Sequence, residues 1–518
     1  MALSRNCRLP KRPRSRVNRT RRFISGIASG YISILCNIAY TAASIPLVLH
    51  YLTKEEFGLW ALAQQIAGYL LMLDLGVSFS LNRLIADQKE RVDSPAYRNW
   101  LKNGALTFAC LGTLMFAMGS GFALLSPSLF AIKETLAREL TIILLILTVV
   151  NSISFSTRIF AAPLWAFQRM DFANLLAALS LVTNFAVLWL CFQMGLGVYS
   201  LALAGILPCF LVPFLTYLFC KKRHYYPLSF WGGSFRSDYL KRLFSFSKDI
   251  FEISIGSHLL QTSQVVILSG ICGLETAAVF AIGTKLYTLI SQLIYKIVES
   301  SAPGLTEIFI SGNSKLFRER LDLLVSLTLF SGFVGALCLF FFNHYFVDIW
   351  TQRAFSWPQT NDIFLALTII CTAFSRWLIG LFGIVADYRS VRHLYIIEAT
   401  AFIIAAIFFA FLFEIKGVLF AAIACHAAIT IPFAFFSFRK ATGLAHLFRP
   451  FCIAIILLSL YMFIQTGNHF CFLSQLDRFF LFLFLTLIFI GLGVLYILPR
   501  ELCRGFITKI VFFNNSLR

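Results

Sequence analysis

Long apolar stretches, each about as long as a membrane-crossing helix, alternate along this chain with short polar gaps. A helix needs about 20 mostly apolar residues to cross the hydrocarbon core of a bilayer. We therefore predict an all-α polytopic membrane protein. Its fourteen transmembrane helices are expected at 23–50, 57–82, 103–127, 139–163, 172–194, 197–220, 249–272, 277–300, 321–343, 362–386, 392–415, 417–438, 450–466 and 478–498. An even number of spans places both termini on one side.

Lysine and arginine are distributed unequally between alternate gaps. One set of gaps is rich in them: Arg83, Lys89, Arg91, Arg98 and Lys102; Arg169; Lys221, Lys222, Arg223, Arg236, Lys241, Arg242 and Lys248; Lys315, Arg318 and Arg320; Arg389 and Arg392; Arg439, Lys440 and Arg449. The intervening gaps carry at most two each: Lys54, Lys133, Arg138, Arg353, Lys416 and Arg478. Because basic loops are retained in the cytoplasm, this alternation predicts that both termini are cytoplasmic and supports the even count.

Residues 1–22 contain nine lysines and arginines and no acid. A stretch of this kind can be an organellar transit peptide or a cytoplasmic tail that orients the first helix. We favour the tail, because the apolar stretch that follows is too long for the core of a signal peptide. This predicts a multi-pass membrane protein whose N-terminal tail is cytoplasmic.

Composition excludes several other classes of protein. The 518 residues are 59% hydrophobic and 13% charged, about half the charged fraction of a soluble domain. The net charge of +20 resides in the short gaps, which is typical of loops on anionic leaflets and not of a nucleic-acid-binding surface. The thirteen cysteines include no C-x-x-C pair, so neither a zinc site nor a disulfide framework is indicated.

An internal repeat emerges when the chain is shifted by 220 residues. Residues 55–61 then align with 275–281, each opening the second span of its half, and Arg158 falls near Arg376. Equal orientation of the halves predicts a parallel repeat about an axis along the membrane normal. The predicted divisions are a tail at 1–22, an N-lobe of spans 1–6 at 23–220, an inter-lobe cytoplasmic loop at 221–248, a C-lobe of spans 7–12 at 249–440, and two further helices with a tail at 441–518.

Polar side chains form stripes on three of the predicted helices. At 100° per residue, one face of the eighth span carries Lys285, Thr288, Gln292, Lys296 and Glu299. The seventh span carries Ser257, Gln261 and Gln264 with His258 beside them, and the repeat maps these positions onto Asn37, Thr41 and Ser44. Matching polar faces indicate a shared wet cavity between the lobes. Hydrogen bonding between helices within each lobe is the alternative.

Charged residues inside the spans are costly and mark candidate sites. By depth, Arg158 lies level with Asp74, and Arg376 lies level with Glu398, so each arginine can form a structural ion pair or bind substrate. Lys285 lies near mid-depth with no acid at its level, although His258 and His426 are there. An unpaired cation at that depth needs an anion, which a transported substrate would provide.

Several short motifs carry a family resemblance. Residues 56–61 read EFGLWA, residues 71–77 read LMLDLGV, and residues 83–86 read RLIA. Residues 168–174 read QRMDFAN and residues 303–307 read PGLTE. These stretches resemble the signatures of bacterial polysaccharide transporters, the O-antigen and capsule flippases of the MOP superfamily. The resemblance extends over residues 23–440.

The resemblance implies a flippase, not an enzyme. Its substrate would be an undecaprenyl-pyrophosphate-linked oligosaccharide, moved from the cytoplasmic to the periplasmic leaflet through a cationic cavity by alternating access. The family often has an acid in the middle of the seventh span, where residues 261–264 of this chain read QTSQ. Ion coupling through that position is therefore not expected, and no bound cofactor is expected beyond a proton or sodium gradient.

The candidate site combines these observations. Substrate-binding candidates are Lys285, Gln292, Lys296, Arg158, Arg376, Gln261, Gln264, Asn37, Thr41 and Gln65, and coupling candidates are Asp74, Glu398, His258 and His426. Expected partners are the lipid-linked oligosaccharide, membrane lipids, and the polymerase and chain-length machinery of polysaccharide synthesis, with no nucleic acid.

Three other functions compete with this one. A lipid II flippase or a cation-coupled drug antiporter would share the two-lobe plan, although an antiporter usually needs a buried acid where this chain has amides and cations. A membrane sugar polymerase or ligase would need catalytic groups at the outer face. That face offers Asp348, Arg353 and Asp362, which we interpret as a solvated rim.

Overall fold

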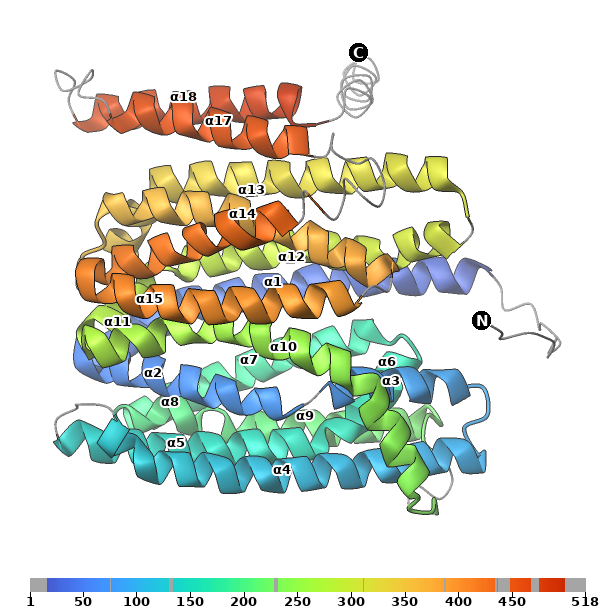
Figure 1. Cartoon of the computed structure of the whole chain (residues 1–518). Helices are drawn as coiled ribbons and strands as arrows, with labels where there is room; N and C mark the ends of the chain where they lie inside the picture. Colours follow the sequence, from blue (N-terminus) through green and yellow to red (C-terminus); the bar gives the residue numbers. More distant parts are fainter. Residues whose placement is uncertain are drawn as a thin grey trace, which may run out of the picture.

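The computed structural model describes residues 16–74, 76–129, 134–227, 232–310, 312–385, 388–433, 436, 448–466 and 475–498. All regular elements in these ranges are helices, and they run side by side along one common direction (Figure 1). We call the end of the bundle where α1 ends, at Tyr51, the far end, and the opposite end the near end. The far end lies at the left in Figure 1.

The helices match the predicted spans in order. Single helices correspond to eight of the predictions: α1 (Arg16–Tyr51), α4 (Pro95–Leu129), α7 (Met170–Gln193), α10 (Ser237–Ile271), α13 (Ser314–Trp350), α14 (Gln359–Val385), α17 (Phe448–Thr466) and α18 (Gln475–Tyr496). Interrupted helices correspond to four more: α2 (Lys54–Leu70), η1 (Leu71–Asp74) and α3 (Val77–Gln88); α5 (Glu134–Ser156), η2 (Thr157–Ala161) and α6 (Ala162–Ala166); α8 (Tyr199–Leu203) and α9 (Ile206–Lys222); α11 (Leu274–Gly283) and α12 (Lys285–Ile310).

The remaining two predicted spans form one hairpin, α15 (Tyr388–Cys425), followed by the π-helical turn η3 (His426–Thr430). The chain reverses at Glu414, whose φ of 50° and ψ of −125° are not helical. Gly417 follows the reversal, and a Cβ on it would overlap the carbonyl oxygen of Phe409. Only glycine lets the two arms approach this closely.

Not every span passes a simple test of length and apolar composition. Seven helices of the described residues are long and apolar enough to cross a membrane, and the bent pair α11 and α12 would make eight. Shorter apolar helices lie at 449–464 and 481–496. The helices that are not among these seven include the interrupted α2 and α3 and the polar-striped α10. The protein is an all-helical, multi-span membrane protein.

The parallel repeat is confirmed by the way the helices pack. In the N-terminal group (α1 to α9), α1 packs on α7 and α4 on α5; in the C-terminal group (α10 to η3), the corresponding α10 packs on α15 and α13 on α14. The pairing of α2 with α5 likewise recurs as α12 with α14. Helices α17 and α18 pack outside this repeat, against α13.

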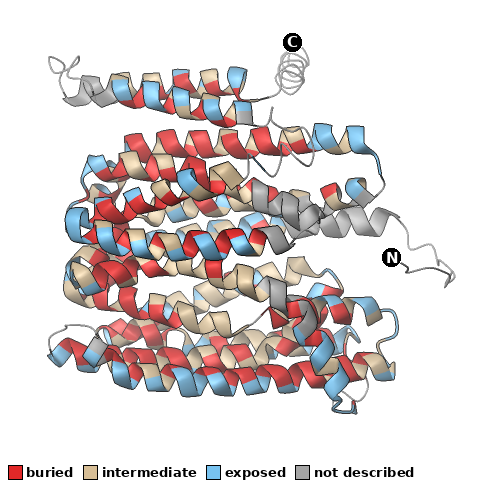
Figure 2. Ribbon diagram, in the orientation of Figure 1, coloured by how far each residue is buried: buried red, intermediate tan, exposed pale blue. Residues whose placement is uncertain are grey.

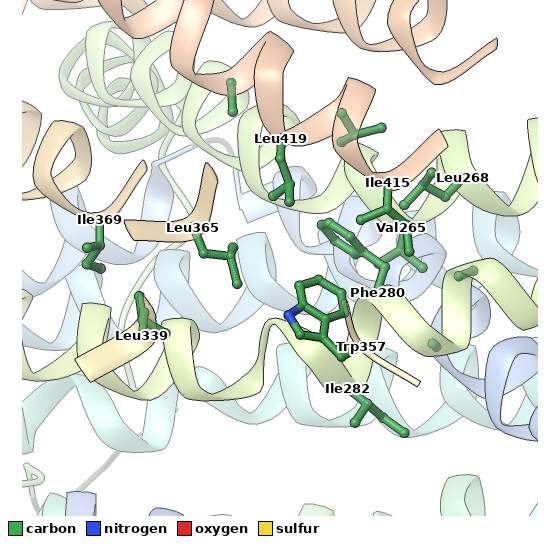
Figure 3. Packing of buried hydrophobic residues seen from close by; sticks show 14 of the residues in the cluster. Val265, Leu268, Phe280, Ile282, Leu339, Trp357, Leu365, Ile369, Ile415 and Leu419 are labelled. Atoms are coloured by element: carbon green, nitrogen blue, oxygen red, sulfur yellow. The ribbon is translucent and has the colours of Figure 1, made fainter. Parts of the chain in front are cut away.

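The buried core is shared by the two groups mainly at the far end. There Val48, Leu62 and other residues of the N-terminal group join one buried cluster with Phe280 and Trp357 of the C-terminal group. Figure 3 shows how Phe280, Trp357 and Ile415 meet from three different segments. Buried positions line the helices of both groups (Figure 2). At the near end the N-terminal group has its own cluster, into which Leu243 of α10 inserts.

The segment 221–248, predicted to be cytoplasmic, is partly helical. Helix α9 ends at Lys222, and α10 already begins at Ser237. Between them, Ser234 and Arg236 donate backbone N–H groups to the side chains of Asn99 (2.8 Å) and Asn103 (3.2 Å). These two asparagines fix the linker to α4.

Candidate functional site

A break in the eighth span positions the first candidate residue, Lys285. Helices α11 and α12 meet at an angle of 43° across Thr284, and Lys285 is the first residue of α12. A helix that stops at Gly283 leaves its last carbonyl groups without intrahelical partners. The Asn343 side chain donates to the Gly283 carbonyl at 3.0 Å. Lys285, a half-buried residue, thus lies at a specific bend and not within a regular helix.

The polar stripe of α12 faces α1 of the other group. Asn37 Nδ2 donates to Gln292 Oε1 at 3.5 Å, and Thr41 donates to Asn37 Oδ1 at 3.4 Å. Two turns of α1 nearer the near end, a Cβ on Gly30 would lie 3.2 Å from Cε of Lys296. The predicted polar stripes of the first and eighth spans therefore meet, at the boundary between the groups.

The stripe of α10 is partly accessible. Gln261 is exposed and donates to Ser257 at 3.3 Å, whereas the half-buried Gln264 donates to the carbonyl of Leu260 at 3.2 Å. On α2, which packs along α10, Gln65 is half-buried. An exposed glutamine in mid-span has no hydrogen-bonding partner in lipid, so this face is suited to a wet boundary between the groups.

A separate charged cluster lies toward the near end. Arg158 Nη1 and Asp74 Oδ1 are 3.2 Å apart, and Ser78 also donates to Asp74. The guanidinium lies over the ring of Phe155, with its central carbon 4.5 Å from the ring centroid. The ion pair predicted from equal depth is therefore present. Asp74 ends the turn η1, so the pair also stabilises the break between α2 and α3.

The second predicted ion pair, between Arg376 and Glu398, is not formed. Glu398 is buried, and its Oε1 lies 2.7 Å from Nδ1 of His426 and accepts a hydrogen bond from Thr430. Arg376 instead lies over the ring of Tyr295, at 4.3 Å from the centroid, and its Nε is buried without a hydrogen-bond partner. Equal depth did not reveal that the two side chains point to different neighbours.

The histidine of this third cluster lies on an irregular element, and its acid, Glu398, lies on α15. His426 and Thr430 are the first and last residues of the π-helical turn η3. Single π turns inside helices are rare and often occur at functional sites. Two coupling candidates predicted separately, Glu398 and His426, are thus brought into direct contact. His258, on α10, is half-buried.

The QRMDFAN motif forms a tight turn before α7. Gln168 adopts a positive φ of 55°, and Arg169 makes two hydrogen bonds of 2.9 Å to the carboxylate of Asp171. These hydrogen bonds raise the pKa of Arg169 above its ordinary value. The guanidinium also lies 4.9 Å from the ring centroid of Phe219. The motif holds the start of α7 and needs no substrate to explain its charges.

The expected solvated rim at the far end is wrong for one of its residues. Arg353 is exposed and Asp348 half-buried, but Asp362 is 0% exposed. Sequence reasoning also passed over Asn343, Tyr295 and Thr430. An asparagine at the end of the predicted apolar span would have been the available signal for Asn343, whereas nothing in the pattern distinguishes Tyr295 from the other aromatic residues.

Residues 28–309, more than half of the chain, match the model of the family described as "Polysaccharide biosynthesis protein". The chain belongs to this family. The matched range includes the EFGLWA and QRMDFAN motifs and the polar stripe of α12. No curated protein matches this chain.

Solved structures share the fold at low sequence identity. An inward-facing multidrug resistance MATE family transporter of the MOP superfamily has a TM-score of 0.66 and 15% identity, over 81% of this chain and 99% of that one. The lipid II flippase MurJ, in an inward closed conformation, has a TM-score of 0.62 and 15% identity, over 97% and 99%. A MOP superfamily transporter from Pyrococcus furiosus gives 0.61 and 15%, over 82% and 96%.

These matches show that the chain shares the fold of these solved transporters. The MurJ match leaves only 3% of the chain uncovered, too little to omit α17 and α18, so the two helices outside the repeat belong to the shared architecture.

Proposed function

We propose that this protein is a flippase that moves an undecaprenyl-pyrophosphate-linked oligosaccharide from the cytoplasmic to the periplasmic leaflet, for O-antigen, capsule or exopolysaccharide synthesis. The observation that carries the proposal is the half-buried Lys285 at the break between α11 and α12, on the polar stripe that reaches α1. The family match supports the polysaccharide substrate class.

The physical task explains why such a site is needed. Burying a sugar hydroxyl without a partner costs about 2–7 kcal/mol, so a glycan with many hydroxyls does not cross a bilayer unaided. Side-chain amides such as those of Gln292 and Asn37 replace the lost water, and the polyprenyl tail stays in lipid. Lys285, Lys296 and Arg376 would hold the pyrophosphate through charge-assisted hydrogen bonds.

The shared buried core suggests how the cycle begins. The two groups are joined through one apolar cluster at the far end, whereas the near-end cluster belongs almost entirely to the N-terminal group. With both termini in the cytoplasm, as the basic gaps predict, the described conformation is closed toward the periplasm. Rocking of the groups about the site would then expose it alternately to the two sides.

Coupling to an ion gradient is assigned to the C-terminal group. The buried Glu398 of α15 is in direct contact with the half-buried His426 of the π-helical turn, which can change its hydrogen bonding when the pair gains or loses a cation. Asp74 is less suited, because Arg158 and Ser78 already occupy its carboxylate. The polymerase and chain-length machinery remain proposed partners in the cytoplasmic membrane.

The test is the sidedness of a lipid-linked glycan in proteoliposomes. Purified protein is reconstituted with a short polyprenyl-pyrophosphate oligosaccharide, and a non-permeant glycosidase reports exposure over time. We expect exposure above that of empty liposomes, lost in Lys285→Ala and retained in Lys285→Arg. Lys416→Ala, which removes an exposed cation at the far end, is the matched control and should behave as the native protein.

Two results would redirect the assignment. Normal exposure by a well-folded Lys285→Ala protein would exclude Lys285 from the transport path. No exposure with several glycans, with or without a proton or sodium gradient, would favour the drug antiporter, which efflux of small organic cations would then test. Exposure of lipid II in preference to other glycans would identify a lipid II flippase.

A further inference from the structure

Asp362 is an acid that the proposed transport path does not use. It lies in the first turn of α14 at the far end, and its side chain is completely buried. A buried carboxylate is costly unless it accepts hydrogen bonds. Removing one of its partners is more destabilising than replacing the carboxylate and its partners together by apolar side chains. Its surroundings therefore indicate what holds it there.

Two donors converge on one oxygen of this carboxylate. Asn343 Nδ2 and Trp357 Nε1 each donate to Oδ1 of Asp362 at 2.7 Å. The other oxygen, Oδ2, faces His344 Nδ1 at 3.4 Å. Asn343 and Trp357 are themselves buried, so the three side chains are joined in one buried network, in which Oδ2 of Asp362 has no hydrogen-bond partner among the described residues.

The same network holds the break in the eighth span. Besides Asp362, the Asn343 amide contacts the carbonyl of Gly283 at 3.0 Å. The Trp357 indole occupies the space in which a Cβ on Gly283 would lie. Asp362 thus orients both groups that fix the end of α11, two residues before Lys285.

The loop that carries Trp357 also reaches the N-terminal group. Phe355 is buried against Phe57, with ring centroids 6.3 Å apart in an edge arrangement, and Lys54 lies 5.5 Å from the centroid of Phe355. Phe57 belongs to the EFGLWA motif. The 351–358 loop is therefore in contact with the N-terminal group on one side and with the break before Lys285 on the other.

We propose that Asp362 is a positioning residue that couples closure of the far end to the bend that presents Lys285. Separating the two groups at the far end has to move Phe355 away from Phe57. Because Trp357 and Asn343 are both bound to Asp362, that movement is transmitted to Gly283 and changes the bend. The inference rests on the proposed alternating access and assigns its mechanical link.

Hydrogen exchange of the full-length protein in detergent tests the link without any transport assay. The peptide covering 273–283 reports the end of α11, and a peptide covering 53–62 reports the EFGLWA motif across the boundary. In Asp362→Ala we expect exchange to accelerate by about tenfold in both peptides, since buried donors lose their acceptor. Asp348→Ala, which removes a half-buried acid on α13 at the same end, should leave both unchanged.

A conservative variant separates positioning from charge. Asp362→Asn retains an oxygen that can accept from Asn343 and Trp357, so we expect native exchange in both peptides. If Asp362→Ala does not fold, Trp357→Phe removes a single donor and should accelerate the same two peptides to a smaller extent. Acceleration confined to 273–283, with 53–62 unchanged, would overturn the coupling across the boundary.

Transport measurements keep this inference distinct from the proposed function. With the flippase assignment correct, Asp362→Ala should lower the maximal rate of glycan exposure while the half-saturating glycan concentration stays within about twofold, as Lys285 itself is retained. If neither the native protein nor any variant exposes a glycan, the flippase assignment fails. Hydrogen exchange in Asp362→Ala still decides whether Asp362 couples the far end to the end of α11. Native exchange in Asp362→Ala would overturn the link whatever is transported.

Discussion

Gly58 of the EFGLWA motif lies directly against the backbone of Leu274, at the start of α11. A Cβ on Gly58 would overlap the Leu274 carbonyl oxygen. The contact joins α2 of the N-terminal group to the C-terminal group, beside the pair formed by Phe57 and Phe355. The motif that carries the family resemblance is therefore part of the boundary that has to open and close, which explains why it requires a residue without a side chain.

The first prediction concerns this contact. Gly58→Val forces two backbones apart, and overpacking of this kind typically costs about 1–3 kcal/mol. We expect a lower unfolding temperature in detergent together with slower glycan exposure. Gly121→Ala is the matched control, because no atom lies within 4 Å of its added Cβ and alanine favours the helix. An unchanged Gly58→Val protein would mean that the boundary does not close as described.

The second prediction concerns the ion pair of Arg158 and Asp74. Asp74→Asn leaves a cation inside the membrane without its counter-charge, which should destabilise the protein by about 1–3 kcal/mol. If the pair is structural, the double variant Asp74→Asn/Arg158→Gln should be more stable than Asp74→Asn alone and should still expose glycan. Thermal unfolding of the three variants measures this. A double variant that is stable but inactive would instead place Arg158 in the transport path.

The third prediction concerns Arg376, which makes no ion pair to any described residue and lies over Tyr295. Loss of a charge-assisted hydrogen bond to pyrophosphate is worth about 1.5–3 kcal/mol. Arg376→Ala should therefore raise the half-saturating glycan concentration about 10- to 100-fold. Arg376→Lys should restore only part of the lost affinity for the glycan, because lysine cannot present a planar pair of donors.

Titration of the glycan in proteoliposomes gives these values. Arg353→Ala removes an exposed arginine at the far end and should leave the half-saturating concentration unchanged. Equal values for Arg376→Ala and the native protein would remove Arg376 from the substrate site.

The fourth prediction concerns the contact between Glu398 and His426. Glu398→Gln keeps the shape of the side chain and can still accept from Thr430, but it cannot bind and release a proton or sodium ion. We expect glycan exposure without a gradient to persist within about twofold, and stimulation by an imposed gradient to disappear. Glu90→Gln, an exposed acid after α3, serves as control. Stimulation that survives in Glu398→Gln would exclude this pair from coupling.

Much of the architecture could be read directly from the order of residues. Each of the fourteen predicted spans has a helical counterpart, including the hairpin that reverses at Glu414, because the length of an apolar stretch is dictated by the thickness of the bilayer. The repeat was readable because both halves present equivalent residues in equivalent order. The pairing of Arg158 with Asp74 was also accessible, since both lie at one depth and a membrane leaves a charge few other partners.

Other features were decided only when the helices packed. Depth in the membrane is a one-dimensional property, whereas a partner is chosen by the direction in which a side chain points. Glu398 therefore contacts His426, which was expected at the depth of Lys285, and not Arg376, which was expected at the depth of Glu398. Asp362 appeared to belong to a solvated rim until Trp357 and Asn343 closed over it.

The bend that presents Lys285 is the clearest case. Polar periodicity along the eighth span indicated which face of the helix is polar, because the spacing of residues determines which side chains share a face. It could not indicate the break at Thr284, since the groups that stabilise the break, Asn343 and Trp357, come from 60 or more residues away in the chain. The sequence alone determines which segments enter the membrane and which faces are polar, because both follow from local spacing. Partners and bends depend on contacts between distant segments, and only the tertiary structure supplies those.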